Sequence, residues 1–260
     1  MKYTLLCDSK KLMETLPLCE KYHLGIEAQG FDGVQFMEEH PDIVEVHKEA
    51  LKNIEHRSIH GLFWDLVPGS SDPLIQAVVR QRFEEAYDQA RAIGADNIVV
   101  HHGGYVHGIF TQKTSQGAWD RRSVEFWKDF LKDKDPSVHF HVENLLEPDP
   151  ESLLYLAENV NMENLDINLD IGHVNYASDI PVVDWIKRLN KHIGYVHIHD
   201  NMGLEDVHHG LGRGNLPLVD IFDALEEYAP DAIWSLEPAQ CELEESIIWL
   251  QEHGYLPVNG

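Results

Sequence analysis

The short β-rich runs VHFHVE (residues 138–143), DINLD (residues 166–170) and GYVHIH (residues 194–199) alternate with segments of helical periodicity at residues 150–159 and 182–189. The same alternation extends outward to both ends of the chain. It adds strand-like runs at residues 3–7, 25–29, 58–62, 97–101 and 232–237, and helical segments at residues 74–93, 218–228 and 243–253. Strands that alternate with amphipathic helices are typical of repeated βα units with a parallel sheet. The sequence therefore predicts an α/β fold with eight parallel strands.

Length and turn chemistry favour a closed barrel over an open sheet. The chain has 260 residues, of which 43% are hydrophobic, and an eight-stranded α/β barrel needs about 250 residues. An open doubly wound sheet would place a glycine-rich phosphate-binding turn after an early strand, whereas residues 7–11 read Cys-Asp-Ser-Lys-Lys. No Gly/Ser-rich linker divides the sequence. We therefore expect a single (β/α)8 TIM barrel domain over residues 1–260, with its longest irregular loops at residues 103–120 and 201–216.

The charge and cysteine content argue against several classes of protein. Acidic residues number 45 against 20 basic ones, which gives a formal net charge of −25, and a field of this sign opposes binding to nucleic acid. The three cysteines, Cys7, Cys19 and Cys241, lack the spacing of a disulfide framework or of a thiolate zinc site. No apolar run reaches the roughly 18 to 20 residues of a membrane span, and the run that ends at Cys7 is too short for an export signal. We expect a cytoplasmic protein that binds neither nucleic acid nor membrane, and the sequence leaves a homo-oligomer open.

Potential metal ligands gather at the carboxyl ends of the predicted strands. Six of the eight strands end at, or within two residues of, a histidine or a carboxylate, and three more such residues follow in the loops. The nine residues are His60, His101, Glu143, Asp170, His173, His197, Asp206, His208 and Glu237. A single acidic residue at a strand end usually caps a helix or forms an ion pair, but nine in register at one mouth of a parallel barrel predict a divalent metal site. Imidazole and carboxylate donors without sulfur suit Zn²⁺, Mn²⁺, Fe²⁺, Co²⁺ or Mg²⁺.

The remaining histidines are interpreted from their positions. Strand alternation turns His141 to the side of Glu143 and His199 to the side of His197, so we expect both near the site. His102 and His209 stay ambiguous. Surface or internally satisfied positions are expected for His56, His107, His139, His192 and His253, which fall at strand starts, in loops or on helices.

With these residues in place, the chain resembles the xylose isomerase-like barrel superfamily, which joins sugar isomerases and epimerases to endonuclease IV. The resemblance runs over nearly the whole chain, and its most specific segments are residues 142–144 (VEN), 169–173 (LDIGH), 196–201 (VHIHDN), 206–215 (DVHHGLGRGN) and 236–237 (LE). In the isomerase and epimerase branch, the resemblance implies one divalent metal held by Glu143, Asp170, His197 and Glu237. It also implies that the two glutamates act as the acid/base pair and that His173 holds a substrate oxygen.

The similarity to endonuclease IV implies a larger metal site, because that enzyme carries three zinc ions on nine ligands, and each ligand finds a counterpart among the nine residues above. One departure is Arg213, which stands between two glycines where the endonuclease has glutamate. Its guanidinium could grip a phosphate or carboxylate of a small substrate, or it could anchor the loop from the surface. His173, His199 and Arg213 are therefore the candidate substrate-binding residues.

Two functions stay open at this point. We expect a metal-dependent isomerase or epimerase of a sugar or sugar phosphate, in which the metal polarises a carbonyl while Glu143 or Glu237 moves a proton. The alternative is a multinuclear zinc phosphoesterase of the endonuclease IV type. It would explain why the sequence places His60, His101, Asp206 and His208 at the same mouth as well. A non-catalytic sugar or metal binding protein would leave the acid/base pair without a task. The predicted cofactors are accordingly zinc or manganese ions, one to three per chain.

Overall fold

The computed structural model describes residues 2–31, 33–104 and 113–258, and its strands form one closed parallel barrel. The barrel follows chain order, and the first strand pairs with both the second and the last. The strands are β1 (Lys2–Cys7), β2 (Gly25–Ala28), β3 (Arg57–His60), β4 (Asn97–His101), β5 (His139–Glu143), β6 (Leu165–Asp170), β7 (Ile193–Ile198) and β8 (Ile233–Leu236). Their ends differ by at most two residues from those predicted from the sequence, and the (β/α)8 fold is confirmed.

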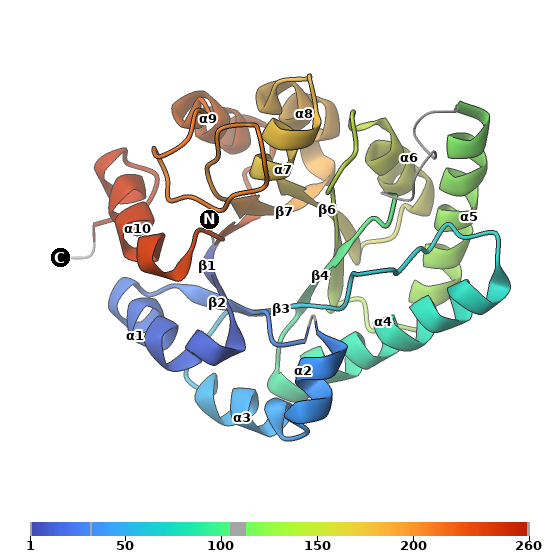
Figure 1. Ribbon diagram of the computed structural model, residues 1–260, viewed down its shortest axis with the longest axis horizontal. Coiled ribbons are helices and arrows are strands. Elements are labelled where there is room, and N and C mark those ends of the chain that lie inside the picture. Colours follow the sequence, from blue (N-terminus) through green and yellow to red (C-terminus); the bar gives the residue numbers. More distant parts are fainter. Residues whose placement is uncertain (1, 32, 105–112, 259–260) are drawn as a thin grey trace.

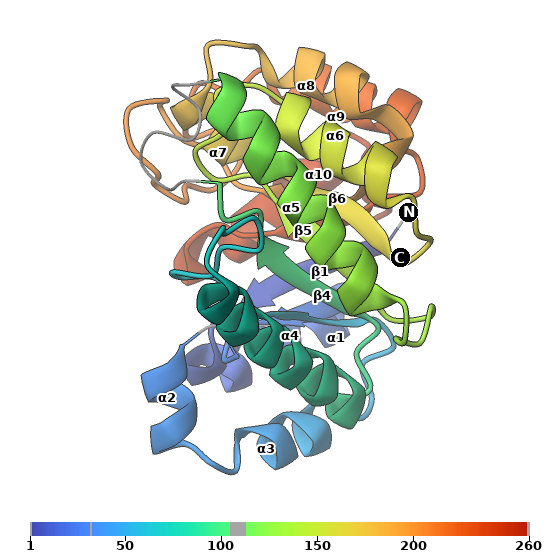
Figure 2. The ribbon, with the colours of Figure 1, turned by 90° about the vertical axis from the view of Figure 1, so that its right-hand side faces the viewer.

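Helices surround the strands in chain order (Figure 1). They are α1 (Leu12–Tyr22), α2 (Val34–Glu39), α3 (Ile43–Ala50), α4 (Pro73–Ile93), α5 (Lys113–Leu131), α6 (Glu151–Val160), α7 (Ile171–Ala177), α8 (Val182–Leu189), α9 (Leu218–Tyr228) and α10 (Leu243–Glu252), with 3-10 turns η1 (Ser9–Lys11), η2 (Asn190–His192) and η3 (Gln240–Glu242). From the side, α4 and α5 cross the outside of the strands, while α2 and α3 lie at one edge of the molecule (Figure 2). None of the described helices combines the length and the apolar character that crossing a membrane requires.

Helix α4 shows how local sequence sets the elements around the barrel. Asp72 caps the first turn by accepting a hydrogen bond from the backbone N–H of Leu74 at 2.8 Å. Pro73 fits the first position, where its missing N–H has no partner to lose. Gly94 ends the helix at a φ of 74°, a left-handed conformation that glycine adopts without strain. Between these signals the buried positions recur at helical spacing, so the helix presents one apolar face to the strands.

Aromatic packing fixes the long helices on the strand that carries the central carboxylate of the site. Trp127 of α5 stacks on Phe83 of α4 with ring centroids 5.1 Å apart, and the two rings lie 5.5 and 6.3 Å from Phe140 of β5. All three side chains are buried. Offset and edge-on aromatic pairs add about 0.5–1.5 kcal/mol each to the free energy of burial. Strand β5, which ends at Glu143, is therefore held firmly from outside the barrel.

The loops after the strands differ in part from the prediction. Helix α5 begins at Lys113, so the segment 103–120, expected to be irregular, is helical from that residue onward. Residues 105–112, with His107 among them, lie outside the described residues. The segment 201–216 has the irregular structure that the sequence predicts, and an isolated bridge joins Asp200 to His209.

Candidate metal centre

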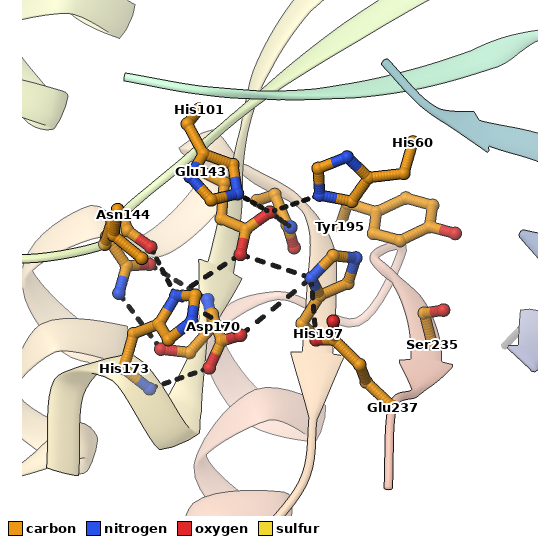
Figure 3. Close-up of polar contacts among 12 residues, drawn as sticks. His60, His101, Glu143, Asn144, Asp170, His173, Tyr195, His197, Ser235 and Glu237 are labelled. Atoms are coloured by element: carbon orange, nitrogen blue, oxygen red, sulfur yellow. Dashed lines mark hydrogen bonds and ion pairs between the residues drawn. The ribbon is translucent and has the colours of Figure 1, made fainter. Parts of the chain in front are cut away.

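The barrel brings the predicted ligands together at the carboxyl ends of its strands (Figure 3). His60, His101, Glu143 and Asp170 are the last residues of β3, β4, β5 and β6. The parallel register places His101 beside Glu143, and Asp170 beside His197 of β7. Residues side by side in adjacent strands point to the same face of a sheet. These side chains are buried and converge inside the mouth of the barrel (Figure 3).

Glu143 lies at the centre of the cluster and is buried. Its Oε2 atom is 3.5 Å from Nε2 of His60 and 3.6 Å from Nε2 of His101. Its Oε1 atom is 3.3 Å from Nδ1 of His197 and 3.3 Å from Nδ1 of His173. Figure 3 shows the four imidazoles gathered around this one carboxylate. Glu143 can therefore serve more than one neighbouring metal position.

Ten side chains form four overlapping groups, within each of which the donor atoms lie within 4.8 Å of one another. The groups are His60–His101–Glu143, Glu143–Asp170–His197, Asp170–His199–Glu237 and His173–His199–Asp206–His208. The first two share Glu143, and the second and third share Asp170. All nine residues predicted as ligands belong to these groups, and His199 joins them.

The ring orientation of three histidines suits metal binding. Nδ1 of His60, His173 and His208 lies 3.0, 2.8 and 2.9 Å from the backbone carbonyl of Gly61, Asn144 and Glu237, respectively. A carbonyl can only accept, so each Nδ1 carries the hydrogen and donates it. Nε2 is therefore the nitrogen that each ring offers to a metal ion, once that nitrogen is deprotonated.

Several polar atoms at the centre have no hydrogen-bond partner although they are buried. They include Oδ2 of Asp170, Nδ1 of His197, Oε2 of Glu237 and both ring nitrogens of His199. A buried polar atom without a partner costs about 1–3 kcal/mol. Convergent nitrogen and carboxylate lone pairs that contact each other but lack hydrogen bonds fit divalent cations, which would occupy the space between them.

Charge interactions keep the carboxylates of Glu143 and Asp170 ionised. Burial alone would raise the pKa of Glu143, but His197 and His101 outweigh it and hold that pKa well below its usual value. Burial would likewise raise the pKa of Asp170, but the nearby His173 outweighs burial and lowers that pKa to about 2. In turn, the carboxylates raise the pKa of His173 and of His197 well above the usual value despite burial, whereas burial lowers the pKa of His101 to about 3. Protons and metal ions would therefore compete for the same histidine lone pairs.

The loop after β7 supplies Asp206 and His208, and Asp200 holds this loop in place. The buried carboxylate of Asp200 accepts hydrogen bonds from the backbone N–H groups of residues 201, 212, 214 and 216 at 2.9, 3.1, 2.8 and 3.2 Å. Gly214 must be glycine here, because a Cβ would lie 2.2 Å from a carboxylate oxygen of Asp200. One buried carboxylate therefore organises the irregular segment that carries two predicted ligands.

Arg213 contacts acidic residues of the neighbouring helix segment. Its guanidinium forms ion pairs with Glu242, at 3.2 Å, and with Glu245, and half of the side chain is exposed. These contacts correspond to the loop-anchoring interpretation of this residue. Its role in substrate binding stays a prediction.

Two other histidines lie away from the donor groups. His141, expected near Glu143, forms a hydrogen bond between its Nε2 and the side-chain oxygen of Asn97 at 2.7 Å. Although it faces the barrel interior, it lies one layer deeper than the cluster, two residues before Glu143 on β5. His102, which the sequence left ambiguous, pairs through Nδ1 with Glu147 at 2.9 Å. Alternation gives the face of a strand correctly, but it does not give the depth.

Glu27 of β2 belongs to the site and was missed from the sequence. Its side chain is completely buried, and both carboxylate oxygens lie 3.1 Å from Nε2 of His197. Burial alone would raise the pKa of Glu27, but His197 outweighs it and holds that pKa below its usual value. The available signal was an acidic residue inside the apolar run Gly25-Ile26-Glu27-Ala28, since charged residues are almost never fully buried unless paired.

Comparison with known proteins gives one family match and one curated relative. The model of a family described as xylose isomerase-like TIM barrel matches residues 26–253. An uncharacterised protein of Methanocaldococcus jannaschii is 28% identical over 191 residues, which cover 69% of this chain. The matched part spans 63% of that relative's length.

Solved structures with similar folds cover almost the whole chain. A D-tagatose 3-epimerase-like protein has a TM-score of 0.79 at 21% identity, with 97% of each chain covered. The IOLI protein with a bound zinc atom has a TM-score of 0.76 at 18% identity, with 99% of this chain and 100% of that chain covered. A Thermus thermophilus protein soaked with ZnCl2 has a TM-score of 0.72 at 25% identity, with 97% of each chain covered. At these identities the first two likenesses concern the fold alone.

Proposed function

Since the chain belongs to the xylose isomerase-like TIM barrel family, we propose that it is a metal-dependent enzyme whose active site is the cluster of donor groups at the carboxyl mouth of the barrel. The proposed substrate is a small, polar sugar or sugar phosphate. Sugar epimerases are among the proteins of similar fold, and a net charge of −25 opposes nucleic acid. The sequence predicted isomerisation or epimerisation with hydrolysis as the alternative, but the overlapping donor groups lead us to propose instead that several metal ions hydrolyse the phosphate ester of a sugar phosphate.

The sharing of Glu143 and Asp170 between donor groups carries this choice of reaction. A single ion on the four residues used by the isomerase branch would leave the groups around His60 and His208 without a metal ion. Groups that share a carboxylate are suited to ions held close together, and closely spaced ions are the arrangement that many phosphoesterases use. The donor atoms therefore favour a multinuclear site over a mononuclear one.

The residues of the chain would divide the remaining work between them. When bound, divalent ions would supply Lewis-acid activation of water and would offset the negative charge that builds on phosphorus. Glu237 is buried and belongs to a donor group, and its carboxylate has two oxygens, so one can bind an ion while the other accepts a proton from the attacking water. His208 lies on the open side of the cluster with 31% of its side chain exposed, where its imidazole can contact the substrate.

Sugar isomerisation or epimerisation is the second candidate, and the placement of the two glutamates favours it. Oε1 of Glu143 and Oε2 of Glu237 lie 3.3 and 3.1 Å from the same nitrogen, Nδ1 of His197. Two carboxylates on either side of one ligand histidine are suited to move a proton next to a substrate carbonyl. This reaction needs one metal ion and leaves the remaining donor groups to hold substrate oxygens.

Metal counting together with two activity assays separates the two candidates. We expect two or three zinc or manganese ions per chain by elemental analysis, and phosphate release from a panel of sugar phosphates. His60→Asn should lower the metal content and phosphate release, whereas His253→Asn, at an exposed histidine bonded to the carbonyl of Trp249, is the matched control and should change neither. One fully occupied ion, with epimerisation and without phosphate release, would establish the second candidate instead.

Both candidates assign an essential role to the two glutamates. Glu143→Gln and Glu237→Gln should each abolish turnover while the circular dichroism spectrum stays native. Glu147→Gln is a suitable control, because Glu147 is also buried and paired with a histidine but lies outside the donor groups. Retained turnover in both active-site variants would remove the glutamates from the acid/base role.

A further inference from the structure

We infer that Glu27 is a positioning residue that fixes the ring of His197, so that Nε2–H points at the Glu27 carboxylate and Nδ1 points into the metal cluster. This inference rests on the metal centre proposed above, which it deepens by naming a residue that none of the four donor groups contains. Glu27 comes from β2, on the other side of the barrel interior, 170 residues away in sequence.

The groups around the Glu27 carboxylate all donate hydrogen bonds to it. Both carboxylate oxygens lie 3.1 Å from Nε2 of His197, and the hydroxyl groups of Tyr195 and Ser235 donate to Oε2 at 2.8 and 2.7 Å. An ionised carboxylate accepts only, so every neighbour in this set must donate to it. Nε2 of His197 therefore carries a hydrogen, and that nitrogen is not available to a metal ion.

The opposite nitrogen of His197 has the surroundings of a ligand atom. Nδ1 makes no hydrogen bond and lies 3.1 Å from Oε2 of Glu237, 3.3 Å from Oε1 of Glu143 and 3.9 Å from Oδ2 of Asp170. In Figure 3 this edge of the ring faces the carboxylates, while Tyr195 and Ser235 lie beside the same imidazole. The ring is thus held by one nitrogen and free to bind through the other.

His197 differs in this respect from the other oriented histidines. His60, His173 and His208 donate Nδ1–H to neutral backbone carbonyls and present Nε2. His197 donates Nε2–H to a charged carboxylate and presents Nδ1. A carboxylate partner fixes the tautomer and makes the imidazole a stronger ligand, and loss of such a partner typically weakens metal affinity about 10- to 100-fold.

A buried support holds the carboxylate itself in place. The Tyr195 hydroxyl, which donates to Glu27, lies 3.0 Å from the hydroxyl of Thr4 and 3.1 Å from that of Ser58. These side chains come from β7, β1 and β3, and all three are buried. Glu27 is therefore held from several strands and cannot turn away from His197 without losing the hydrogen bonds from the buried hydroxyl groups of Tyr195 and Ser235.

The first test is zinc affinity, measured by competition with a chromophoric chelator. In Glu27→Gln the side chain keeps its shape but loses its charge, and one ion should bind about 10- to 100-fold more weakly than in the wild type. Glu147→Gln removes a buried carboxylate that pairs with a histidine outside the donor groups, and its zinc affinity should stay at the wild-type value. A merely structural role of Glu27 would lower the unfolding midpoint without this selective loss of affinity.

The second test uses the wild type and does not depend on the variant folding. In zinc-loaded protein with ¹⁵N-labelled histidine, the ring of His197 should show a protonated Nε2 and a metal-shifted Nδ1. A protonated Nδ1 would overturn the inference, as would equal zinc affinities of Glu27→Gln and wild type. If the wild type binds no zinc or manganese, the proposed metal centre fails and the inference fails with it. If the wild type binds and only the Glu27 results fail, the metal centre stands.

Discussion

Replacement of Asp200 by asparagine should loosen the loop at residues 201–216 and weaken the donor group that contains Asp206 and His208. The carboxylate accepts four backbone hydrogen bonds, two on each oxygen. An asparagine oxygen can replace the oxygen that accepts from residues 201 and 216. Its NH₂ group would then face the N–H groups of Gly212 and Gly214, which are donors themselves.

The expected magnitude follows from the two lost hydrogen bonds. A hydrogen bond to a charged group contributes about 1.5–3 kcal/mol, so two of them give about 3–6 kcal/mol. The two glycine contacts are only partly buried, and water can replace part of what is lost. We therefore expect Asp200→Asn to lower the unfolding free energy by about 3 kcal/mol. If the whole of this free energy is lost from metal binding by Asp206 and His208, the ion that they hold should bind as much as about 100-fold more weakly, since 1.4 kcal/mol corresponds to a factor of ten.

Urea denaturation and zinc titration measure the two effects. Asp72→Asn is the matched control, because Asp72 accepts one hydrogen bond at the start of α4 and asparagine is an equally good cap, so its change should stay within about 0.5 kcal/mol. An unfolding free energy of Asp200→Asn equal to that of the control, with unchanged zinc affinity, would refute the reasoning from the loop contacts.

Gly172→Ala should lower the unfolding free energy in urea by about 1–3 kcal/mol and reduce bound zinc, because the added Cβ would lie 2.1 Å from Cε1 of His199. A stable variant with full zinc content would show that His199 can move freely. His47→Gln should reduce the acid sensitivity of folding. Burial lowers the pKa of native His47, so below about pH 6.5 the unfolded chain takes up a proton that the native state does not. Stability of the wild type then falls as the pH drops, and the difference between wild type and variant in urea midpoints at pH 5 and pH 7.5 measures this contribution. Arg213→Ala should change the unfolding free energy by no more than about 1 kcal/mol, because the guanidinium is half exposed and ion pairs of exposed groups contribute little. It should raise KM for phosphorylated over unphosphorylated substrates if the guanidinium contacts the phosphate, and equal KM values would leave Arg213 as a loop anchor.

The sequence by itself determined the barrel and the residues that reach its mouth. Alternation of apolar runs with helical segments predicted eight strands whose ends lie within two residues of those observed. The position of His101, Glu143 and Asp170 at strand ends then predicted that they meet, because parallel strands all end on the same face of a barrel. This part of the site follows from local pattern and from one rule of topology, and neither depends on how the side chains pack.

The tertiary structure alone decided how these residues are grouped and oriented. Three features depend on distances between separate loops and strands. They are the donor groups that share Glu143 and Asp170, the ion pairs of Arg213 with glutamates of the neighbouring segment and the loop anchored on Asp200. The contact of Glu27 with His197 joins residues 170 positions apart. It exists because closure of the barrel turns β2 and β7 toward a common interior, and the depth of a side chain there is set by strand tilt and stagger. Linear periodicity gives the face on which a residue lies, whereas only the closed three-dimensional arrangement gives its height and its partner.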